Sequence, residues 1–568
     1  MRTHHALATL LALTVFVLLT ADAGAQTTLH TFLGTKGGDS SGYSIANAGD
    51  VDGDGFDDVV VGSPFHDLQD FPTQHVDSGR MFVFSGATGA ALMLEYGEGA
   101  GHHFGFDVDG AGDVNADGFA DVIVGVPGKS SGSFTVFLGP DGGTALETTL
   151  TLAGQTGFGT SVAGCGDADG DGYDDVVIGS PYESTGPGLD EAGHVYVYDV
   201  FHQNIAGSVL GTQAGARLGW SVDGAGDVDG DGRPDVVVGE PFRDLIQFPG
   251  PSFFADAGRV TVFSTNVLDL APVVTVNGPL VTGGEFGYAV AGDVLTFGDV
   301  IPDFVVGAPG LNGDTGEVTV RSGTNGTVIR TITGSNAGER YGAAVACGGD
   351  FNADGGPDLI VGAPSYDLPP LGINRGRIEV RTVQSGDLLH SATTLSGGQI
   401  GFAVDIGAHT DIDGRAEILY GAPYNDATAP DAGAAFVVSS SDALAAWSNY
   451  GAGLAGALGE PTVTVGGSPS LGTIMELVLG SSAPATVPGV LAVGITSQAA
   501  PFKGGTMLVS PLLQIGLSVP PVSLSLPFVV PTNPLLLGAD TYVQLWMADP
   551  GAPVNVSLSQ GLKITFGD

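Results

Sequence analysis

Aspartates recur at alternate positions of one short stretch near the start of the chain, residues 50–58. Carboxylates occupy positions 1, 3, 5 and 9 of this stretch, and Gly55 occupies position 6. Oxygen ligands at alternate positions of a tight loop suit a hard cation such as Ca²⁺, and glycine permits the sharp turn that such a loop requires. The stretch therefore predicts a calcium-binding loop.

The residue at position 12 distinguishes between two kinds of calcium loop. A helix–loop–helix site uses a bidentate glutamate there, whereas this chain has Val61 inside a β-branched run. Such a run is typical of a buried strand. We therefore expect this loop to join two strands.

The pattern returns four more times, and position 12 is Val or Ile in every copy. The predicted calcium ligands of the five intact loops are Asp50, Asp52, Asp54, Asp58, Asp113, Asn115, Asp117, Asp121, Asp167, Asp169, Asp171, Asp175, Asp227, Asp229, Asp231, Asp235, Asp350, Asn352, Asp354 and Asp358. Four carboxylates this close repel one another strongly without a cation. The alternative is that each loop is an acidic, solvated turn.

Two further repeats depart from the pattern. The fifth, from Asp293 to Asp303, is two residues too long and lacks the glycine at position 6, so we expect no metal there. The seventh has a histidine at position 1 but keeps three carboxylates, Asp411, Asp413 and Glu417. The sequence thus predicts about five Ca²⁺ ions and leaves a sixth, in the seventh repeat, open.

Each loop is followed by an apolar run ending in Gly-x-Pro, and this ending occurs seven times at intervals of 54 to 68 residues. An aromatic residue followed by glycine precedes most of the loops. Examples are Phe104-Gly105, Phe158-Gly159, Phe286-Gly287 and Tyr341-Gly342. Each repeat is consistent with four strands, the first two joined by the acidic loop.

These pairs, loops and Gly-x-Pro endings resemble the FG-GAP repeats of the integrin α-subunit β-propeller. The resemblance covers roughly the first three quarters of the chain and includes all seven units. It implies a seven-bladed β-propeller with calcium bound in its loops. It does not imply integrin function, because one fold hosts many functions.

The seventh repeat lacks a good outer strand after residues 434–438, whereas residues 28–33 precede the first repeat just as outer strands precede the others. We therefore expect the N-terminal strand to complete the seventh blade. Such closure removes two open sheet edges.

Strand directions alternate, so the acidic loops and the variable loops after Gly-x-Pro are expected on opposite faces. The variable loops carry the aromatic residues Phe71, Tyr182, Phe248, Phe253, Phe254 and Tyr366. Variable loops on a rigid scaffold commonly bind ligands, and aromatic side chains are common anchors. Capping of the blades from within is an alternative role for these rings.

The chain divides into four predicted parts. Residues 1–25 have the pattern of a secretory signal, with a membrane anchor as the alternative, 26–440 form the propeller, 441–460 a Ser- and Gly-rich linker, and 461–568 a small β-sandwich-like domain. No later stretch is apolar for the roughly 20 residues that a membrane-spanning helix needs, so we expect no transmembrane segment in the mature chain. These features predict a secreted or cell-surface protein.

Charge excludes two classes of partner. The chain has 17 basic and 62 acidic residues, a net charge of −45, which argues against nucleic acid and anionic membranes. We therefore predict a non-enzymatic binding or adhesion protein with structural calcium and an extracellular glycan or protein ligand.

Two alternatives remain. One is a calcium-dependent hydrolase or lyase acting on polysaccharide or lipid, because FG-GAP-like propellers accompany such domains. Against it, the sequence has no Gly-x-Ser-x-Gly elbow in a strand–turn–helix context and no His-Glu-x-x-His motif. The other alternative is a cell-envelope scaffold.

Overall fold

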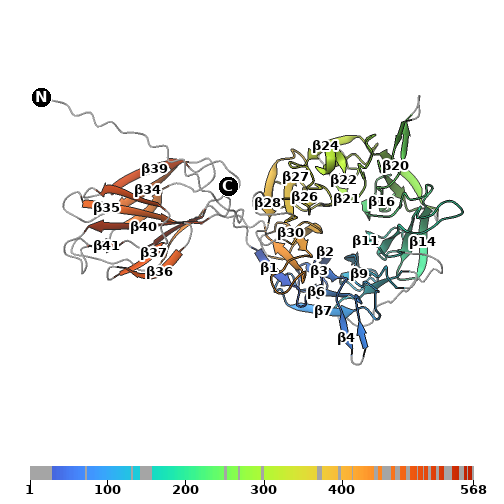
Figure 1. Ribbon diagram of the computed structural model, residues 1–568, viewed down its shortest axis with the longest axis horizontal. Coiled ribbons are helices and arrows are strands. Elements are labelled where there is room, and N and C mark those ends of the chain that lie inside the picture. Colours follow the sequence, from blue (N-terminus) through green and yellow to red (C-terminus); the bar gives the residue numbers. More distant parts are fainter. Residues whose placement is uncertain are drawn as a thin grey trace. The chain divides into compact units, whose positions relative to one another are not determined.

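Small antiparallel sheets follow one another along the chain and form a closed ring in the computed structural model (Figure 1). The structure describes residues 28–439, except 71–72, 130–131, 141–156, 248–251, 267–268, 296–299, 368–373, 394–397 and 412–413, and separate strands between residues 446 and 565. The predicted signal, residues 1–25, lies outside this range. The described propeller has seven blades, as the repeats predicted.

Each blade begins with a strand beside the channel and continues outward. The innermost strands are β2 (Ser44–Gly49), β8 (Val108–Gly112), β11 (Ser161–Gly166), β15 (Val222–Gly226), β21 (Ala289–Val294), β25 (Ala344–Cys347) and β29 (Val404–Ala408). The second strands are β3 (Asp58–Ser63), β9 (Asp121–Gly125), β12 (Asp175–Ser180), β16 (Asp235–Glu240), β22 (Asp303–Ala308), β26 (Asp358–Ala363) and β30 (Glu417–Ala422).

The third strands are β6 (Arg80–Phe84), β10 (Phe134–Phe137), β13 (His194–Asp199), β19 (Arg259–Ser264), β23 (Glu317–Arg321), β27 (Arg377–Thr382) and β31 (Ala434–Val438). The described outer strands are β7 (Ala91–Tyr96), β14 (Asn204–Leu210), β20 (Ala271–Asn277), β24 (Val328–Thr333), β28 (Leu388–Thr393) and β1 (Thr28–Leu33).

The N-terminal strand closes the ring, which confirms the prediction made for residues 28–33. β1 pairs antiparallel with β31 and places Thr31 opposite Phe436. In Figure 1 the blue β1 lies beside the orange strands of the seventh blade. β1 and β31 stand at opposite ends of the propeller segment, so this pairing closes the ring and removes its open sheet edges.

The hydrophobic core lies between neighbouring blades. The second strands are buried along their whole length, for example β3 and β16. A cluster that includes Val60 and Val83 of blade 1 and Val122 and Val124 of blade 2 is typical of these interfaces. Continuous Val and Ile runs form these strands because both faces of each sheet are covered by another sheet.

Two hairpins project from the loops that follow Gly-x-Pro. They are β4 (Leu68–Asp70) with β5 (Thr73–His75) in blade 1, and β17 (Leu245–Gln247) with β18 (Ser252–Phe254) in blade 4. A single helical turn, α1 (Leu311–Asp314), occupies the corresponding loop of blade 5. Within the described part of the chain, no helix has the length and apolar character that a membrane crossing requires.

Contacts divide the chain into two compact units, Thr27–Ser440 and a second unit that contains the strands after Ser441. One sheet of the second unit has the order β32-β42-β40-β35-β38 with β41 on β40, a second is β33-β34-β39, and the third is β36-β37. The bounds are β32 (Ala446–Tyr450), β33 (Thr462–Gly466), β34 (Ile474–Gly480), β35 (Val487–Gly494), β36 (Ser497–Phe502), β37 (Gly505–Val509), β38 (Leu513–Val519), β39 (Ser523–Val529), β40 (Asp540–Ala548), β41 (Val556–Leu558) and β42 (Gly561–Thr565).

A strand falls within the predicted linker. The predicted linker, 441–460, contains the strand β32, which pairs with β42. Trp447 and Tyr450 favour extended structure, and the Ser and Gly runs on both sides obscured that short signal in the sequence.

Candidate metal centres

The acidic loops join the first and second strands of their blades, as predicted. In blade 1 the loop leaves β2 at Asp50 and enters β3 at Asp58. The Asp50 carboxylate accepts hydrogen bonds from the backbone N–H groups of Gly53 at 2.7 Å, Asp54 at 3.0 Å and Gly55 at 2.9 Å. The first aspartate therefore shapes the loop around its own side chain.

Glycine at position 6 has a conformational reason. Gly55 has φ of +92°, and its four counterparts, Gly118, Gly172, Gly232 and Gly355, have φ between +85° and +96°. A side chain at such φ values is strained, so glycine is needed for the chain to turn back toward position 9. The structure thus reproduces the turn that the spacing predicted.

The aspartate at position 9 is the buried end of each loop. Asp58 is fully buried, and its Oδ2 accepts the N–H of Val51 at 2.9 Å. Burial raises the pKa of Asp58, Asp121, Asp235 and Asp358 to about 7 and that of Asp175 to about 8. A bound divalent cation would favour the charged form and displace these protons.

The second oxygen of the position-9 aspartate differs among blades. In blades 1 and 2 the Oδ1 atom accepts the N–H of Gly86 at 3.1 Å or of Gly139 at 3.0 Å. A Cβ atom on Gly86 would lie 1.9 Å from a backbone oxygen, so only glycine allows this approach.

Blades 3, 4 and 6 have Val200, Thr265 and Val383 at the position of that glycine. There Oδ1 of Asp175, Asp235 and Asp358 is buried and has no hydrogen-bond partner among the described residues. An unsatisfied buried carboxylate oxygen is costly, and a cation is the partner that fits it.

In three loops the carboxylates at positions 1, 3 and 9 converge. One ligand atom from each lies within 4.8 Å of the others in the sets Asp50–Asp52–Asp58, Asp167–Asp169–Asp175 and Asp227–Asp229–Asp235. Asn115 and Asn352 occupy position 3 in the other two intact loops, and their amides donate to Asp117 and Asp354, each at 2.9 Å. Loops 3 and 4 therefore combine convergent carboxylates with an unpartnered buried oxygen.

The two irregular repeats are built differently. In blade 5, Asp303 accepts the N–H of Gly323 at 2.9 Å, as in blades 1 and 2. In blade 7, the buried Glu417 accepts the N–H of Thr410 at 2.7 Å, and His409 Nδ1 contacts the carbonyl oxygen of Arg415 at 2.8 Å. Asp411 lies in the described loop, but Asp413 lies outside the described residues.

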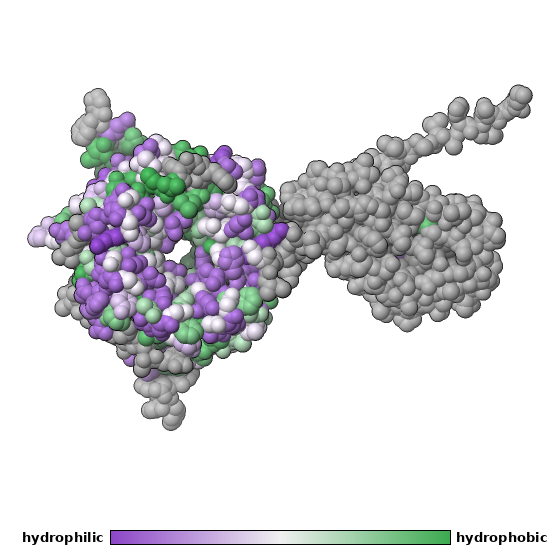
Figure 2. Space-filling view, turned by 180° about the vertical axis from the view of Figure 1, so that it is seen from behind, coloured by the Kyte–Doolittle hydropathy of each residue, from purple (hydrophilic) through white to green (hydrophobic). Residues whose placement is uncertain are grey.

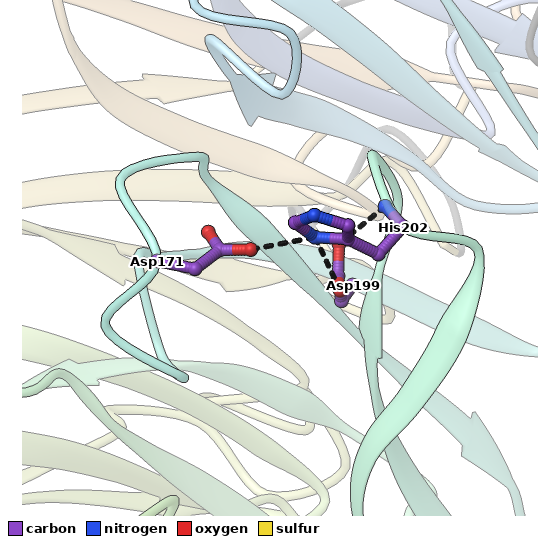
Figure 3. Close-up of side chains that lie close together, drawn as sticks. All are labelled: Asp171, Asp199 and His202. Carbon is purple, nitrogen blue, oxygen red and sulfur yellow. Dashed lines mark hydrogen bonds and ion pairs between the residues drawn. The ribbon is translucent and has the colours of Figure 1, made fainter.

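Sequence reasoning missed two residues that lie against the third loop, Asp199 at the end of β13 and His202 in the turn that follows (Figure 3). His202 Nδ1 is 2.7 Å from Asp171 Oδ2 and 3.1 Å from Asp199 Oδ2. Asp199 precedes no glycine-rich loop, and its only sequence signal is an acidic residue at the end of an apolar strand.

It also missed carboxylates that lie on the innermost strands or directly before them and that bridge neighbouring blades. Asp405 accepts the N–H of Asn47 at 2.6 Å, Asp107 that of Val162 at 2.9 Å and Asp223 that of Gly292 at 2.9 Å. Burial raises the pKa of Asp107 and Asp405 to about 6 and that of Asp223 to about 7. Figure 2 shows an opening at the centre of the propeller, surrounded mainly by hydrophilic residues.

The repeats of this chain are similar to a known repeat family and to several integrin alpha chains. The FG-GAP repeat model matches residues 41–84, 158–198 and 218–263. Integrin alpha-4 of Xenopus laevis is 30% identical over 249 residues, which cover 40% of this chain and 22% of that protein. Integrin alpha pat-2 of Caenorhabditis elegans is 33% identical over 232 residues, covering 35% and 18%.

Integrin alpha-V of Gallus gallus is 30% identical over 217 residues, covering 35% of this chain and 20% of that protein. The chain thus spans about a fifth of the length of these relatives. The matched segments contain acidic loops 1, 3 and 4, whose position-1, -3 and -9 carboxylates converge. The chain therefore contains FG-GAP repeats and is similar to integrin α-subunits in this region.

Proposed function

We propose that this protein is an exported, non-enzymatic binding module whose acidic loops hold structural Ca²⁺. In this proposal the face opposite the loops recognises an extracellular glycan or protein. The ligand-binding part of this proposal rests on one observation. A set of aromatic side chains lies at those ends of the strands that are opposite the acidic loops.

The topology places these rings on one face. Tyr43, Phe106, Trp220, Tyr288 and Phe402 each follow the glycine that precedes the first strand, so they stand at the end of that strand opposite its acidic loop. The second strand runs antiparallel to the first. Phe65, Tyr182, Phe242 and Tyr424, which follow the Gly-x-Pro at the end of the second strand, therefore lie on the same face.

The rings form two groups in contact. In the first, the ring of Tyr43 lies 5.5 Å from Phe65, 5.1 Å from Phe106 and 4.7 Å from Phe402 between ring centroids. All four side chains are only partly buried. Tyr424, 36% exposed, extends this group through Phe402 at 6.2 Å. These sequence positions were not among the predicted anchors.

Trp220 is the centre of the second group. Its ring lies 5.0 Å from Phe242 and 5.5 Å from Tyr288, and the Arg217 guanidinium stands 4.9 Å from the centroid of Tyr182 and 5.0 Å from that of Phe242. Tyr182 was a predicted anchor, and its half-buried ring packs against the Arg217 guanidinium. Phe253 is 62% exposed, whereas Phe71 and Phe248 lie outside the described residues.

The arginines on this face are paired. Arg217 bonds Glu191 at 2.7 Å, Arg340 bonds Glu285 at 2.6 Å and Arg377 bonds Glu339 at 2.9 Å. Their charges are therefore largely compensated, and the ring faces are the main recognition surface. Flat apolar faces with a polar edge suit the hydrophobic side of a sugar ring or the aromatic and aliphatic side chains of a protein.

The enzyme alternative has one local feature to account for. Residues 38–42 match the letters Gly-x-Ser-x-Gly, and Ser40 has φ of +52°. The corresponding residues of other blades, among them His103, Arg217 and Glu285, have φ of +52° to +56°. This strain is therefore a property of the repeat and no mark of a nucleophile.

The test is a screen of the full chain against glycans and extracellular proteins, with calcium and with EDTA, followed by variants of the aromatic face. For any ligand found, we expect Phe402→Ala and Trp220→Ala to weaken binding at least ~10-fold, because central aromatic anchors dominate binding energy. Phe201→Ala, which removes a 42% exposed ring on the acidic-loop side, is the matched control. Unchanged binding in both face variants, or calcium-dependent turnover of a ligand, would contradict the proposal.

A further inference from the structure

The third acidic loop differs from the others because an imidazole lies against its position-5 carboxylate. We propose that Asp171, Asp199 and His202 form a separate site for a transition-metal ion such as Zn²⁺, beside the calcium site of that loop. The ligand atoms would be Oδ2 of Asp171, Oδ2 of Asp199 and Nδ1 of His202. The proposal deepens the proposed calcium function, since Asp171 would join the two sites.

The three groups come from two segments of the chain and lie close together (Figure 3). Asp171 belongs to the loop between β11 and β12, whereas Asp199 ends β13 and His202 stands in the β13–β14 turn. One ligand atom of each lies within 4.8 Å of the other two. Nδ1 of His202 faces both carboxylates, at 2.7 Å and 3.1 Å.

The carboxylates are held in place before any ion arrives. Asp199 is 1% exposed and accepts hydrogen bonds from the His202 N–H at 2.8 Å and from the Asn204 amide at 2.7 Å. Asp171 Oδ1 accepts the N–H of Tyr173 at 3.0 Å, which leaves its Oδ2 directed at the imidazole. Such supporting hydrogen bonds orient metal ligands and tune their affinity.

Two aromatic rings confine the imidazole. Tyr173 of the loop stacks on Phe201 with centroids 3.7 Å apart and planes 6° apart. The His202 ring stands nearly perpendicular to both, at 6.0 Å and 5.1 Å. The imidazole side chain is still 52% exposed, so an ion can enter from solvent.

The donor set determines the class of ion. The calcium loops offer oxygen atoms alone, which suit Ca²⁺, whereas one imidazole nitrogen with two carboxylates suits Zn²⁺ and similar ions. In blade 4 the Asn266 amide contacts the position-5 aspartate, Asp231, from the corresponding turn. An amide is a poor ligand for these ions, so the site is specific to blade 3 among the blades where this contact is described.

The calcium site of the third loop contains a buried oxygen that a cation would satisfy. Oδ1 of Asp175 is buried without a hydrogen-bond partner among the described residues. Asp199 places a further carboxylate beside this loop, with an oxygen within 4.8 Å of one of Asp171, and a second cation would compensate its charge.

The test uses the untagged full chain and Zn²⁺ as the probe, with saturating Ca²⁺ present so that the loops are filled. Competition with a chromophoric zinc indicator should detect one Zn²⁺ per chain. His202→Asn and Asp199→Asn should each weaken that binding at least ~10-fold, whereas His102→Asn, which removes a histidine on the opposite face, should not. Circular dichroism in Ca²⁺ would verify that the variants fold.

X-ray absorption at the zinc edge of the wild-type protein gives a second readout that needs no variant. We expect one imidazole together with oxygen ligands. The proposal is overturned if Ca²⁺ displaces the Zn²⁺, if His202→Asn binds Zn²⁺ as the wild type does, or if the spectrum contains no imidazole. Histidine-dependent Zn²⁺ binding in a protein whose melting ignores Ca²⁺ would support this site while refuting structural calcium, so the two proposals fail separately.

Discussion

Phe32 of β1 stacks face to face on Phe84 of blade 1, with ring centroids 3.8 Å apart and planes 7° apart. Phe82 continues the stack at 5.1 Å from Phe84. His30 of the same strand contacts the carbonyl oxygen of Gly86 at 2.6 Å, and the N–H of Gly86 donates to Asp58. The strand that closes the ring is thus connected to the first acidic loop.

Phe32→Ala should destabilise the whole propeller. The side chain is 8% exposed, and removing it leaves a cavity at the closure seam, for which we expect a loss of about 3 kcal/mol in the free energy of unfolding. Chemical denaturation measures this loss. Leu33→Ala on the same strand, where the side chain is 44% exposed, is the control and should change stability by well under half as much. Equal losses of unfolding free energy in the two variants would show that the packing of Phe32 between β1 and blade 1 does not stabilise the propeller.

Chelation should lower the melting temperature. A ligand that binds only the folded state stabilises it by about 2.7 kcal/mol per site at 100 times its Kd, so removing Ca²⁺ with EDTA withdraws that contribution from each filled loop. Differential scanning calorimetry with EDTA, and again after excess Ca²⁺, measures the shift. Melting that ignores both additions would show that the acidic loops are solvated turns.

The fourth and fifth repeats provide a matched pair for counting ions. Asp235 and Asp303 both end their loops at the start of the second strand and are almost fully buried, but only Asp303 has its Oδ1 satisfied by a backbone N–H. We expect Asp235→Asn to remove one Ca²⁺ per chain in equilibrium dialysis, and Asp303→Asn to remove none.

Asp235→Asn also tests whether the carboxylate of Asp235 destabilises the calcium-free protein. Without calcium, Asp235→Asn should leave the melting temperature unchanged or raise it, because the variant relieves repulsion among carboxylates. A lost ion in Asp303→Asn, or none lost in Asp235→Asn, would refute the assignment of sites.

Stability should fall as pH rises through the range where the bridging carboxylates ionise. Burial raises the pKa of Asp223 to about 7 from its ordinary value of 3.8, so the folded state holds a proton that the unfolded state has released. This contribution is present below the unfolded pKa and is lost as pH rises toward 7, with a slope of at most about 1.4 kcal/mol per pH unit.

Asp223→Asn should flatten this slope. Urea denaturation between pH 5 and pH 8 in saturating Ca²⁺ measures it, since filled loops do not titrate there. Asp190→Asn, at an exposed position, is the control and should retain the wild-type slope. Identical pH profiles for wild type and Asp223→Asn would exclude this carboxylate as the cause.

Local patterns were enough to predict the repeating parts of this protein. Alternate aspartates with glycine at position 6 fix a loop within nine residues, because the first carboxylate bonds the backbone of its own turn. A continuous apolar run fixes the buried second strand. Even the pairing of β1 with β31 followed from counting strands, since a ring with one strand missing at its end and one extra at its start has a single closure.

The tertiary structure decided what residues from separate segments do together. No spacing in the chain connects Asp171 with Asp199 and His202, because their meeting depends on how far the β13–β14 turn reaches over the loop. Likewise, Tyr43 and Phe402 meet only because the ring closes. Whether the buried Oδ1 of Asp235 has a partner depends on the residue after the third strand of the blade, 30 residues away, where Thr265 replaces the glycine whose N–H donates in blade 1. Sequence determined the elements and their acidic loops, whereas contacts between segments that lie apart in the chain determined which other side chains meet.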